Sequence, residues 1–254
     1  MTTLQDLNRE VVGCHACSRL VAWREQVAVE KRAAFREETY WGRPVPSFGD
    51  PGARILIVGL APAAHGANRT GRMFTGDRSG EWLFRALHRA GFASGPVSES
   101  RDDGLTLIDA WLTAAVHCAP PDNRPTPNER RQCQGYLERE LTLLLPQLRG
   151  IVALGNFAWN QLYRASAALD LHVPRPRPRF GHRAEAPLLA EASDPVRGNV
   201  PVIGSYHPSQ QNTFTGRLTP RSFDAVLRKV ARHLEKPAGP GRRARPARQG
   251  GRTP

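Results

Sequence analysis

Four short apolar runs along the chain predict strands rather than helices. They occupy residues 54–60, 111–117, 151–154 and 200–203, and Val, Ile, Leu and Ala dominate them. Continuous apolar runs of about four to eight residues are typical of strands that are buried on both faces of a parallel sheet. The pattern therefore predicts four parallel strands in the interior of the protein.

Amphipathic segments with recognisable helix starts alternate with these strands. Apolar residues recur at helical spacing after Ser79, and Gly91 stands where such a helix would end. Residues 126–129 (Thr-Pro-Asn-Glu) form a capping box, which predicts a helix that reaches about Leu145. Thr219 precedes a further helix with a single apolar stripe. This alternation predicts an α/β fold, a single three-layer domain with a four-stranded parallel sheet flanked by helices.

Two stretches fall outside the alternation. Residues 165–199 mix proline, arginine and acidic residues without a regular period, which predicts a surface excursion. Residues 237–254 contain five arginines, no acidic residue and no apolar residue larger than proline, so they cannot bury enough surface to fold. We therefore expect a folded domain over residues 1–236 and a basic disordered tail over 237–254. A non-specific arm for phosphates is the alternative role of the tail.

The balance of charges favours a polyanionic partner. The chain has a formal net charge of +13, from 36 Lys and Arg against 23 Asp and Glu, and only five of the arginines lie in the tail. No stretch approaches the ~20 apolar residues of a membrane span, and the N-terminus lacks the pattern of a signal peptide. We therefore expect a cytoplasmic protein that acts as a monomer and has no membrane partner.

Polar or glycine-rich segments follow all four predicted strands. These segments occupy residues 59–77, 118–127, 155–159 and 205–219. In open parallel sheets, ligands bind beyond the carboxyl ends of the strands, and these ends all lie at one edge. The sequence therefore predicts an active site at that edge. The last segment is unusual in this arginine-rich chain, because it is neutral for most of its length and carries one imidazole, that of His207.

The four cysteines are spaced as metal ligands. Cys14 and Cys17 form a C-x2-C pair after a short N-terminal helix, Cys118 ends the second strand, and Cys133 lies in the helix that follows. Disulfides are rare in the cytoplasm, whereas four thiolates suit a metal site. Zinc and a [4Fe–4S] cluster both accept four cysteines, and the spacing does not separate them. Unrelated free thiols are the remaining alternative.

Three of these motifs resemble a known family. Residues 59–77 (GLAPAAHGANRTGRMFTGD), the segment Cys118-Ala-Pro-Pro and residues 205–219 (SYHPSQQNTFTGRLT) look like the type 5 branch of the uracil-DNA glycosylase superfamily. The resemblance implies excision of uracil, and of other deaminated bases such as hypoxanthine, from double-stranded DNA, which leaves an abasic site for base excision repair. It also implies a [4Fe–4S] cluster on the four cysteines.

The resemblance assigns roles to individual residues. Phe74 matches the aromatic that stacks on the extruded base, and His207 matches the imidazole that donates a hydrogen bond to the departing base. Such a donor lowers the barrier where negative charge develops, by about 3–4 kcal/mol. The polar residues after His207 suit insertion into the groove of a duplex from which one base has been flipped. These residues are Ser209, Gln210, Gln211 and Asn212.

The first motif departs from related branches. Gly59 and Ala61 are expected to line the base pocket, but relatives place Asp or Asn at the position of Ala61 to orient the attacking water. Ala114 likewise lacks the amide with which a related branch pairs the base edge, so we expect base identity to be checked loosely. The candidates for the missing polar contacts are Asn68, Asp77 and Asn123, with Asn68 and Asn123 placed in catalysis and Asp77 in substrate binding.

Two other classes of function share some of these features. A non-catalytic iron–sulfur regulator that binds DNA would share the charge and the cysteines, but it gives no reason for His207 at a strand end. A phosphate-handling enzyme would use residues 59–77, but these lack the Gly-Lys-Ser/Thr ending of a phosphate loop. The sequence therefore favours a monofunctional DNA glycosylase, an N-glycosyl hydrolase.

Overall fold

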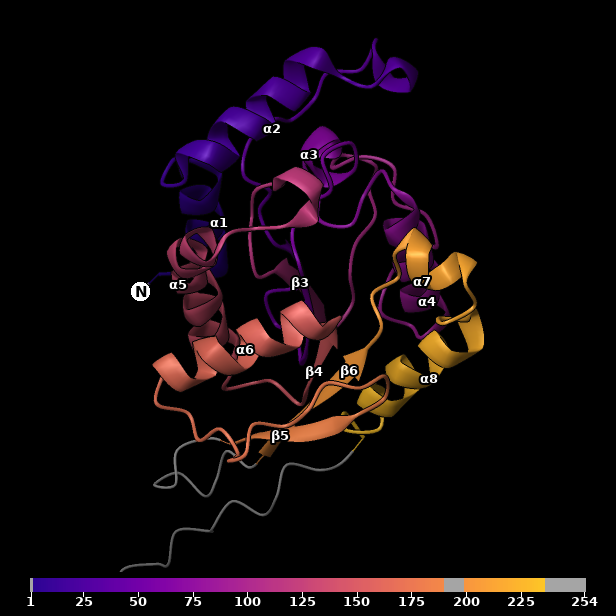
Figure 1. The fold of residues 1–254 in the computed structure, drawn as a ribbon. Coiled ribbons are helices and arrows are strands. Elements are labelled where there is room, and N and C mark those ends of the chain that lie inside the picture. The colour runs from indigo at the N-terminus through magenta and orange to yellow at the C-terminus, as the bar shows by residue number, and fades with distance from the viewer. Residues whose placement is uncertain (1, 190–198, 236–254) are drawn as a thin grey trace, which may run out of the picture.

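The computed structural model describes residues 2–189 and 199–235, so the predicted tail lies outside the described residues (Figure 1). The helices are α1 (Leu4–Val12), α2 (Ser18–Glu30), η1 (Ala33–Phe35), α3 (Ala67–Thr70), α4 (Arg78–Arg89), η2 (Pro121–Asn123), α5 (Pro127–Leu144), α6 (Asn156–Ala168), α7 (Gln210–Phe214) and α8 (Pro220–Ala231). The strands are β1 (Phe48–Gly49), β2 (Ile55–Gly59), β3 (Ala110–Ala114), β4 (Gly150–Leu154), β5 (Glu185–Leu189) and β6 (Asn199–Ser205).

One mixed sheet forms the middle layer, with the order β1-β3-β2-β4-β6-β5. Its four central strands are parallel, which confirms the predicted α/β fold and the four predicted strands. Two antiparallel edge strands were not predicted, β1 beside β3 and β5 beside β6. The expectation that residues 165–199 form only a surface excursion is therefore wrong, because Glu185–Leu189 extends the sheet.

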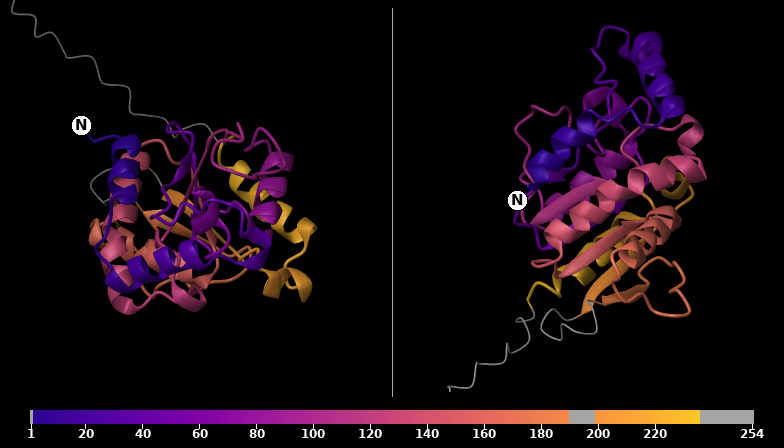
Figure 2. Two further views of the ribbon diagram at one scale, coloured as in Figure 1. Left: turned by 90° about the horizontal axis from the view of Figure 1, so that it is seen from above. Right: turned by 90° about the vertical axis from the view of Figure 1, so that its left-hand side faces the viewer.

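Alternate residues of the central strands face opposite helical layers. Ile55 and Ile57 of β2 pack in one apolar cluster with α4 and α8, whereas Leu56 and Val58 pack in another with α5 and α6. Strands that are apolar on both faces require cover on both faces, which is why the sequence pattern is continuous rather than alternating. The three layers can be followed in Figure 2.

Local capping chemistry sets where most of the predicted helices begin. The capping boxes of Thr126 and Thr219 are both formed, and α5 ends at Leu144, close to the expected Leu145. The helix expected after Ser79 begins at Arg78, before Ser79 rather than after it, because the carboxylate of Asp77 caps it and accepts from the backbone N–H of Gly80. Both α2 and α6 were missed, and neither has a side-chain hydrogen bond at its N-cap.

Helix α2 and the short η1 lie beyond the carboxyl ends of the central strands, at the end of the molecule that also holds α3 (Figures 1 and 2). Among the residues that the structure describes, no helix is long and apolar enough to cross a membrane.

Candidate active site

A pocket of about 640 Å³ opens at the carboxyl edge of the sheet. Residues that follow all four central strands line it, represented by Ala61 after β2, Asn123 after β3, Phe157 after β4 and His207 after β6. The parallel arrangement of these strands brings segments together that are far apart in the sequence. The structure therefore brings the four predicted segments to one place.

An aromatic pair forms part of the pocket wall. The rings of Phe74 and His207 lie with their centroids 5.8 Å apart and their planes inclined by 28°. Phe74 has a positive φ of 56°, and its ring lies over Gly59 so closely that a Cβ there would be 2.5 Å from Cζ of Phe74. Gly59 is therefore required beneath the ring rather than as part of the pocket surface.

The imidazole of His207 is free to meet a ligand. In the described part of the chain, neither ring nitrogen makes a hydrogen bond, while the backbone carbonyl of His207 accepts one from Nδ2 of Asn212 at 2.8 Å. Burial lowers the pKa of His207 to about 4, so the ring is neutral near pH 7. A neutral imidazole has one N–H to donate and one nitrogen to accept.

Two of the three polar candidates line the pocket, and the third does not. Asp77 and Asn123 both line it, and burial raises the pKa of Asp77. Asn68 is fully buried elsewhere, where its Nδ2 donates to the carbonyl oxygens of Arg24 at 3.2 Å and Ala64 at 3.4 Å. Its side chain therefore joins α2 to the segment after β2.

The polar residues after His207 divide between two surfaces. Ser209, Gln211 and Asn212 line the pocket, whereas Gln210 lines a neighbouring groove of about 630 Å³. That groove shares Asp77 and Asn123 with the pocket, so the two hollows adjoin.

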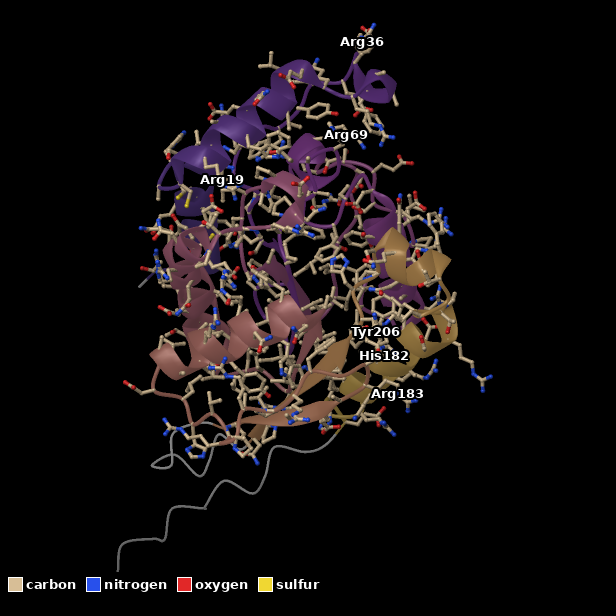
Figure 3. The ribbon with its side chains drawn as sticks, viewed as in Figure 1. Arg19, Arg36, Arg69, His182, Arg183 and Tyr206 are labelled. Carbon is tan, nitrogen blue, oxygen red and sulfur yellow. The ribbon has the colours of Figure 1, made fainter. Side chains whose placement is uncertain are left out.

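Several lining residues were not found from the sequence. Tyr206 lies between the imidazole of His182, whose centroid is 4.9 Å away, and the guanidinium of Arg217, 4.3 Å from the ring centroid. Figure 3 shows Tyr206 and His182 side by side near β6. Phe180 reaches the pocket from the stretch taken as a surface excursion. The one sequence feature that points to Tyr206 as a pocket residue is its position directly before His207.

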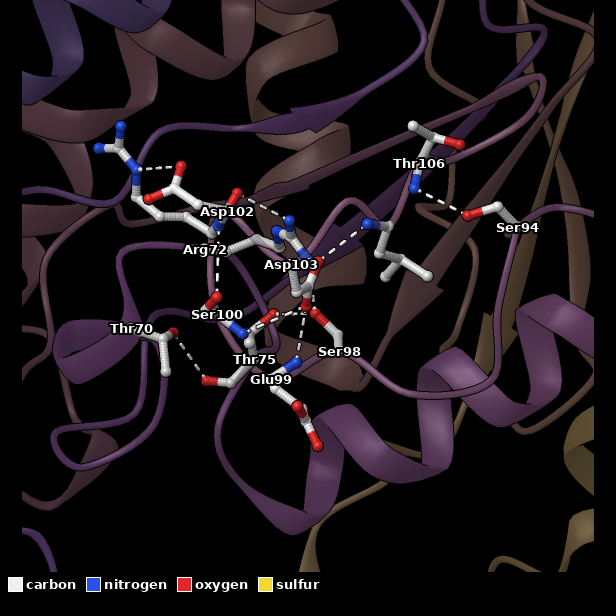
Figure 4. Close-up of polar contacts among 12 residues, drawn as sticks. Thr70, Arg72, Thr75, Ser94, Ser98, Glu99, Ser100, Asp102, Asp103 and Thr106 are labelled. Carbon is white, nitrogen blue, oxygen red and sulfur yellow. Dashed lines mark hydrogen bonds and ion pairs between the residues drawn. The ribbon is translucent and has the colours of Figure 1, made fainter.

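An ion pair between the buried Arg72 and the partly exposed carboxylate of Asp103 holds the segment that carries Phe74. Arg72 is 4% exposed and donates to Asp103 at 2.7 Å, to Ser98 at 2.9 Å and to the carbonyl of Arg101 at 2.8 Å (Figure 4). Thr75 bonds to the same Ser98 hydroxyl at 2.7 Å. These contacts fix residues on both sides of Phe74 to the loop that precedes β3.

The four cysteines line one small cavity of about 20 Å³, away from the pocket. Burial is the largest cause that raises the pKa of three of these thiols, to about 11 for Cys118 and in the same direction for Cys17 and Cys133. In residues 2–189 and 199–235, no three His, Cys, Asp or Glu side chains form a group that could hold a single metal ion.

A buried arginine indicates which kind of group this cysteine-lined cavity can hold. Arg24 is 1% exposed, and its guanidinium donates to Sγ of Cys118 at 3.1 Å and to the carbonyl of Cys14 at 3.3 Å. Its nearest carboxylate is that of Glu25, 3.5 Å away on an exposed side chain, and its Nε has no partner among the described residues. A buried cation requires a compensating negative charge. Four thiolates that hold an iron–sulfur cluster would supply it, so these residues fit that group.

Comparisons with known proteins agree with this geometry. Residues 46–231 match the family model described as "Uracil DNA glycosylase superfamily". The chain is 52% identical over 225 residues to the type-5 uracil-DNA glycosylase of Mycobacterium tuberculosis, which covers 89% of this chain and 80% of the relative. It is 52% identical over 223 residues to the type-5 enzyme of Thermus thermophilus, with 87% and 94% covered. The type-4 enzyme of Archaeoglobus fulgidus is 30% identical over 159 residues, with 62% of each chain covered.

Proposed function

The chain belongs to the uracil DNA glycosylase superfamily and to its type-5 branch, and from this premise we propose how it excises uracil from DNA and which further bases and cofactor it takes. It is a glycosylase that hydrolyses the bond between the base and the deoxyribose. The bond from the sugar carbon to the base nitrogen breaks, and its electron pair leaves with the base. A water oxygen then bonds to the sugar carbon, and the proton that the water loses goes through solvent to the anionic base. The products are an abasic site and the free neutral base.

His207 supports the departure of the base. Negative charge spreads onto the carbonyl oxygens of the leaving base, and a fixed N–H donor stabilises that charge in the transition state. The imidazole is neutral because its pKa is lowered to about 4, and its nitrogens have no competing bond within the described chain. This free imidazole at the pocket, opposite Phe74, is the observation that carries the proposal.

Asp77 and Asn123 are the groups that hold the attacking water. Both line the pocket, whereas Asn68 does not, and Ala61 offers only a methyl group. The carboxylate of Asp77 already accepts from Gly80, which fixes its orientation. An acceptor oxygen in each side chain can bind a water hydrogen and direct the oxygen lone pair toward the sugar.

The substrate range extends beyond uracil to other deaminated bases, including the purine hypoxanthine. Ala61 lines the pocket with a methyl group only, whereas Ala114 is buried in the core and does not line the pocket, so neither side chain reads the pairing edge of a base. The pocket of about 640 Å³ leaves room for a purine. Selection among bases then depends on how readily each base leaves as an anion. Several deaminated bases meet this condition.

Double-stranded DNA is the proposed substrate form, and the protein acts on it as a monomer. A base within a duplex cannot reach a pocket at a sheet edge unless it is extruded, which costs a few kcal/mol and is repaid by contacts to the strand. The formal charge of +13 supplies attraction to phosphates.

A [4Fe–4S] cluster held by Cys14, Cys17, Cys118 and Cys133 is the proposed cofactor. Four thiols and the buried Arg24 support it. None of the four cysteines lines the pocket. The four cysteines come from the segment that leads into α2, the segment after β3 and α5, so a cluster that they held would join these elements and serve structure rather than chemistry.

A gel assay on matched duplexes tests the proposal. Duplexes with one uracil, one hypoxanthine or no damaged base are incubated with the protein and then heated in alkali, which cleaves the strand at an abasic site. We expect cleavage at uracil and at hypoxanthine and none in the undamaged duplex. Binding without cleavage at uracil would contradict glycosylase function and would favour a DNA-binding regulator. Cleavage at uracil alone would contradict the broader substrate range.

A further inference from the structure

Phe214 is a large aromatic side chain left open to solvent at the end of α7. Its exposed fraction is 65%, and it belongs to none of the apolar clusters that form the core of the described chain. Helix α7 begins three residues after His207, and its Gln211 and Asn212 line the pocket. Phe214 therefore stands beyond the mouth of the pocket, on the helix that forms part of its rim.

Arg78 stacks on Phe214 from the opposite side of the rim. Its guanidinium carbon lies 4.4 Å from the centroid of the Phe214 ring. Arg78 directly follows Asp77, which lines the pocket, and it lines the adjoining groove itself. The pair thus bridges the segment after β2 and the segment after β6, the two segments that carry Phe74 and His207.

Arg78 has no carboxylate partner in the part of the chain that the structure describes. None of the ion pairs among the described residues includes Arg78, and its side chain is exposed. The guanidinium is therefore free to attract a phosphate while it holds one face of Phe214. With an exposed fraction of 65%, Phe214 keeps most of its surface open to solvent although Arg78 stacks on it.

An exposed cation–π pair stabilises a fold only weakly. Stability alone therefore gives little reason to expose a phenyl ring beside a pocket. A nucleobase offers a flat π face, and stacking of a base on an aromatic side chain strengthens binding to nucleic acid by roughly tenfold. The combination of a free cation and a free aromatic face matches the chemistry of a nucleotide rather than that of an apolar peptide.

We propose that the open face of Phe214, held by Arg78, is a stacking platform for the nucleobase that neighbours the extruded uracil. This inference rests on the proposed function, since it assumes that uracil in DNA enters the pocket. The platform holds the strand at one side of the extruded nucleotide, so that the sugar of that nucleotide stays aligned with the pocket.

A double-mutant cycle, with one change in the protein and one in the DNA, tests the proposed stacking platform. Dissociation constants are measured for duplexes that contain a deoxyuridine analogue whose base–sugar bond resists hydrolysis. In two further duplexes, an abasic analogue replaces the neighbour on the 5′ side or the neighbour on the 3′ side. The proteins are wild type, Phe214→Ala, Phe214→Trp and the control Ile108→Ala, which shortens a half-exposed apolar side chain before β3 at the opposite edge of the sheet.

We expect wild type and Ile108→Ala to lose roughly tenfold in affinity when one of the two neighbouring bases is missing. Phe214→Ala should bind the intact duplex roughly tenfold more weakly than wild type does. Removal of that same neighbouring base should not weaken the binding of Phe214→Ala any further. Phe214→Trp should behave as wild type, because it keeps an aromatic face.

Two results would overturn the platform. One is that Phe214→Ala binds the intact duplex as tightly as wild type. The other is that the loss of binding free energy in Phe214→Ala and the loss caused by removal of either neighbouring base are simply additive. Failure of wild type to cleave a normal uracil duplex would instead count against the proposed function, so the two failures are distinguishable.

Discussion

The ring of Phe74 lies against the imidazole of His207 rather than apart from it, with centroids 5.8 Å apart. Aromatic pairs are in direct contact at centroid separations of about 4.5–7 Å, so a third ring does not fit between them as they stand. A base that stacks on Phe74 must therefore displace the imidazole from that face to the edge of the base. The carbonyl oxygens of uracil lie at that edge, where a donor is needed.

Substitution of Gly59 by Ala should disturb this arrangement. The added Cβ would lie 2.5 Å from Cζ of Phe74, so the ring must move. A shift of about 1 Å in a positioning residue can cost about a hundredfold in rate, and we expect a loss of that order in single-turnover release of uracil. Gly135→Ala is the matched control, because no atom lies within 4 Å of its Cβ position in α5. Equal rates for the two variants would show that Phe74 does not position the base.

Ala61→Asn should narrow the pocket that Ala61 lines. The amide offers a water-binding group close to the sugar, so we expect activity on uracil to be kept or raised. Activity on the bulkier hypoxanthine should fall, because the longer side chain takes up space that a purine needs. Single-turnover release of both bases from matched duplexes measures the two effects. A variant that gains on hypoxanthine and loses on uracil would place Ala61 away from the base.

Arg24→Gln should weaken retention of the proposed [4Fe–4S] cluster. The variant removes the buried positive charge that lies 3.1 Å from Sγ of Cys118. Wild-type protein prepared without oxygen should hold about four irons per chain, and the variant should hold fewer and lose its visible absorbance sooner. Arg54→Gln is the control, since Arg54 makes a half-exposed ion pair with Asp109 at the other end of β2. Zinc instead of iron in the wild type would contradict the cluster assignment.

Protonation of the Asp103 carboxylate should make the free energy of unfolding depend on pH in the acid range. Burial alone would raise its pKa, but hydrogen bonds from backbone N–H groups and from Arg72 lower it to about 2, below the ordinary 3.8. The carboxylate therefore stabilises the fold above about pH 4, and this contribution is lost as the pH falls from 4 toward 2.

Urea unfolding at several pH values measures this effect. Between neutral pH and about pH 3, wild type should lose on the order of 1 kcal/mol more unfolding free energy than Asp103→Asn, which has no carboxylate to protonate. The same pH dependence in both proteins would show that the Arg72–Asp103 pair does not stabilise the fold.

The four central strands could be predicted because each is a continuous apolar run. Helix α5 could be predicted from its capping box, and helix α8 from Thr219 and a single apolar stripe, because these patterns are local in sequence. Helix α2 was missed because Arg24 occupies a position of its buried face, between Leu20 and Val27, and breaks the apolar period. In the structure Arg24 faces the cysteines. The residue that interrupts the apolar pattern of α2 is therefore also the one that indicates the role of this helix beside the cysteines.

The site shows a similar division. His207, Phe74 and Asp77 follow predicted strands, and the parallel topology is enough to bring them to one pocket. Which way Asn68 faces on α3 depends on tertiary packing that no local pattern reports. Phe180 lines the pocket and His182 stacks on Tyr206 in a stretch that has no regular period and that is joined to the sheet by the long-range pairing of β5 with β6.

The most direct measurement is single-turnover release of uracil from a duplex by wild type and by His207→Ala, with the exposed His172→Ala as control. We expect His207→Ala to be slower by about two to three orders of magnitude, the scale of one lost donor in the transition state, with nearly unchanged affinity for DNA. Equal rates for wild type and His207→Ala would remove His207 from the mechanism and contradict the account of the pocket.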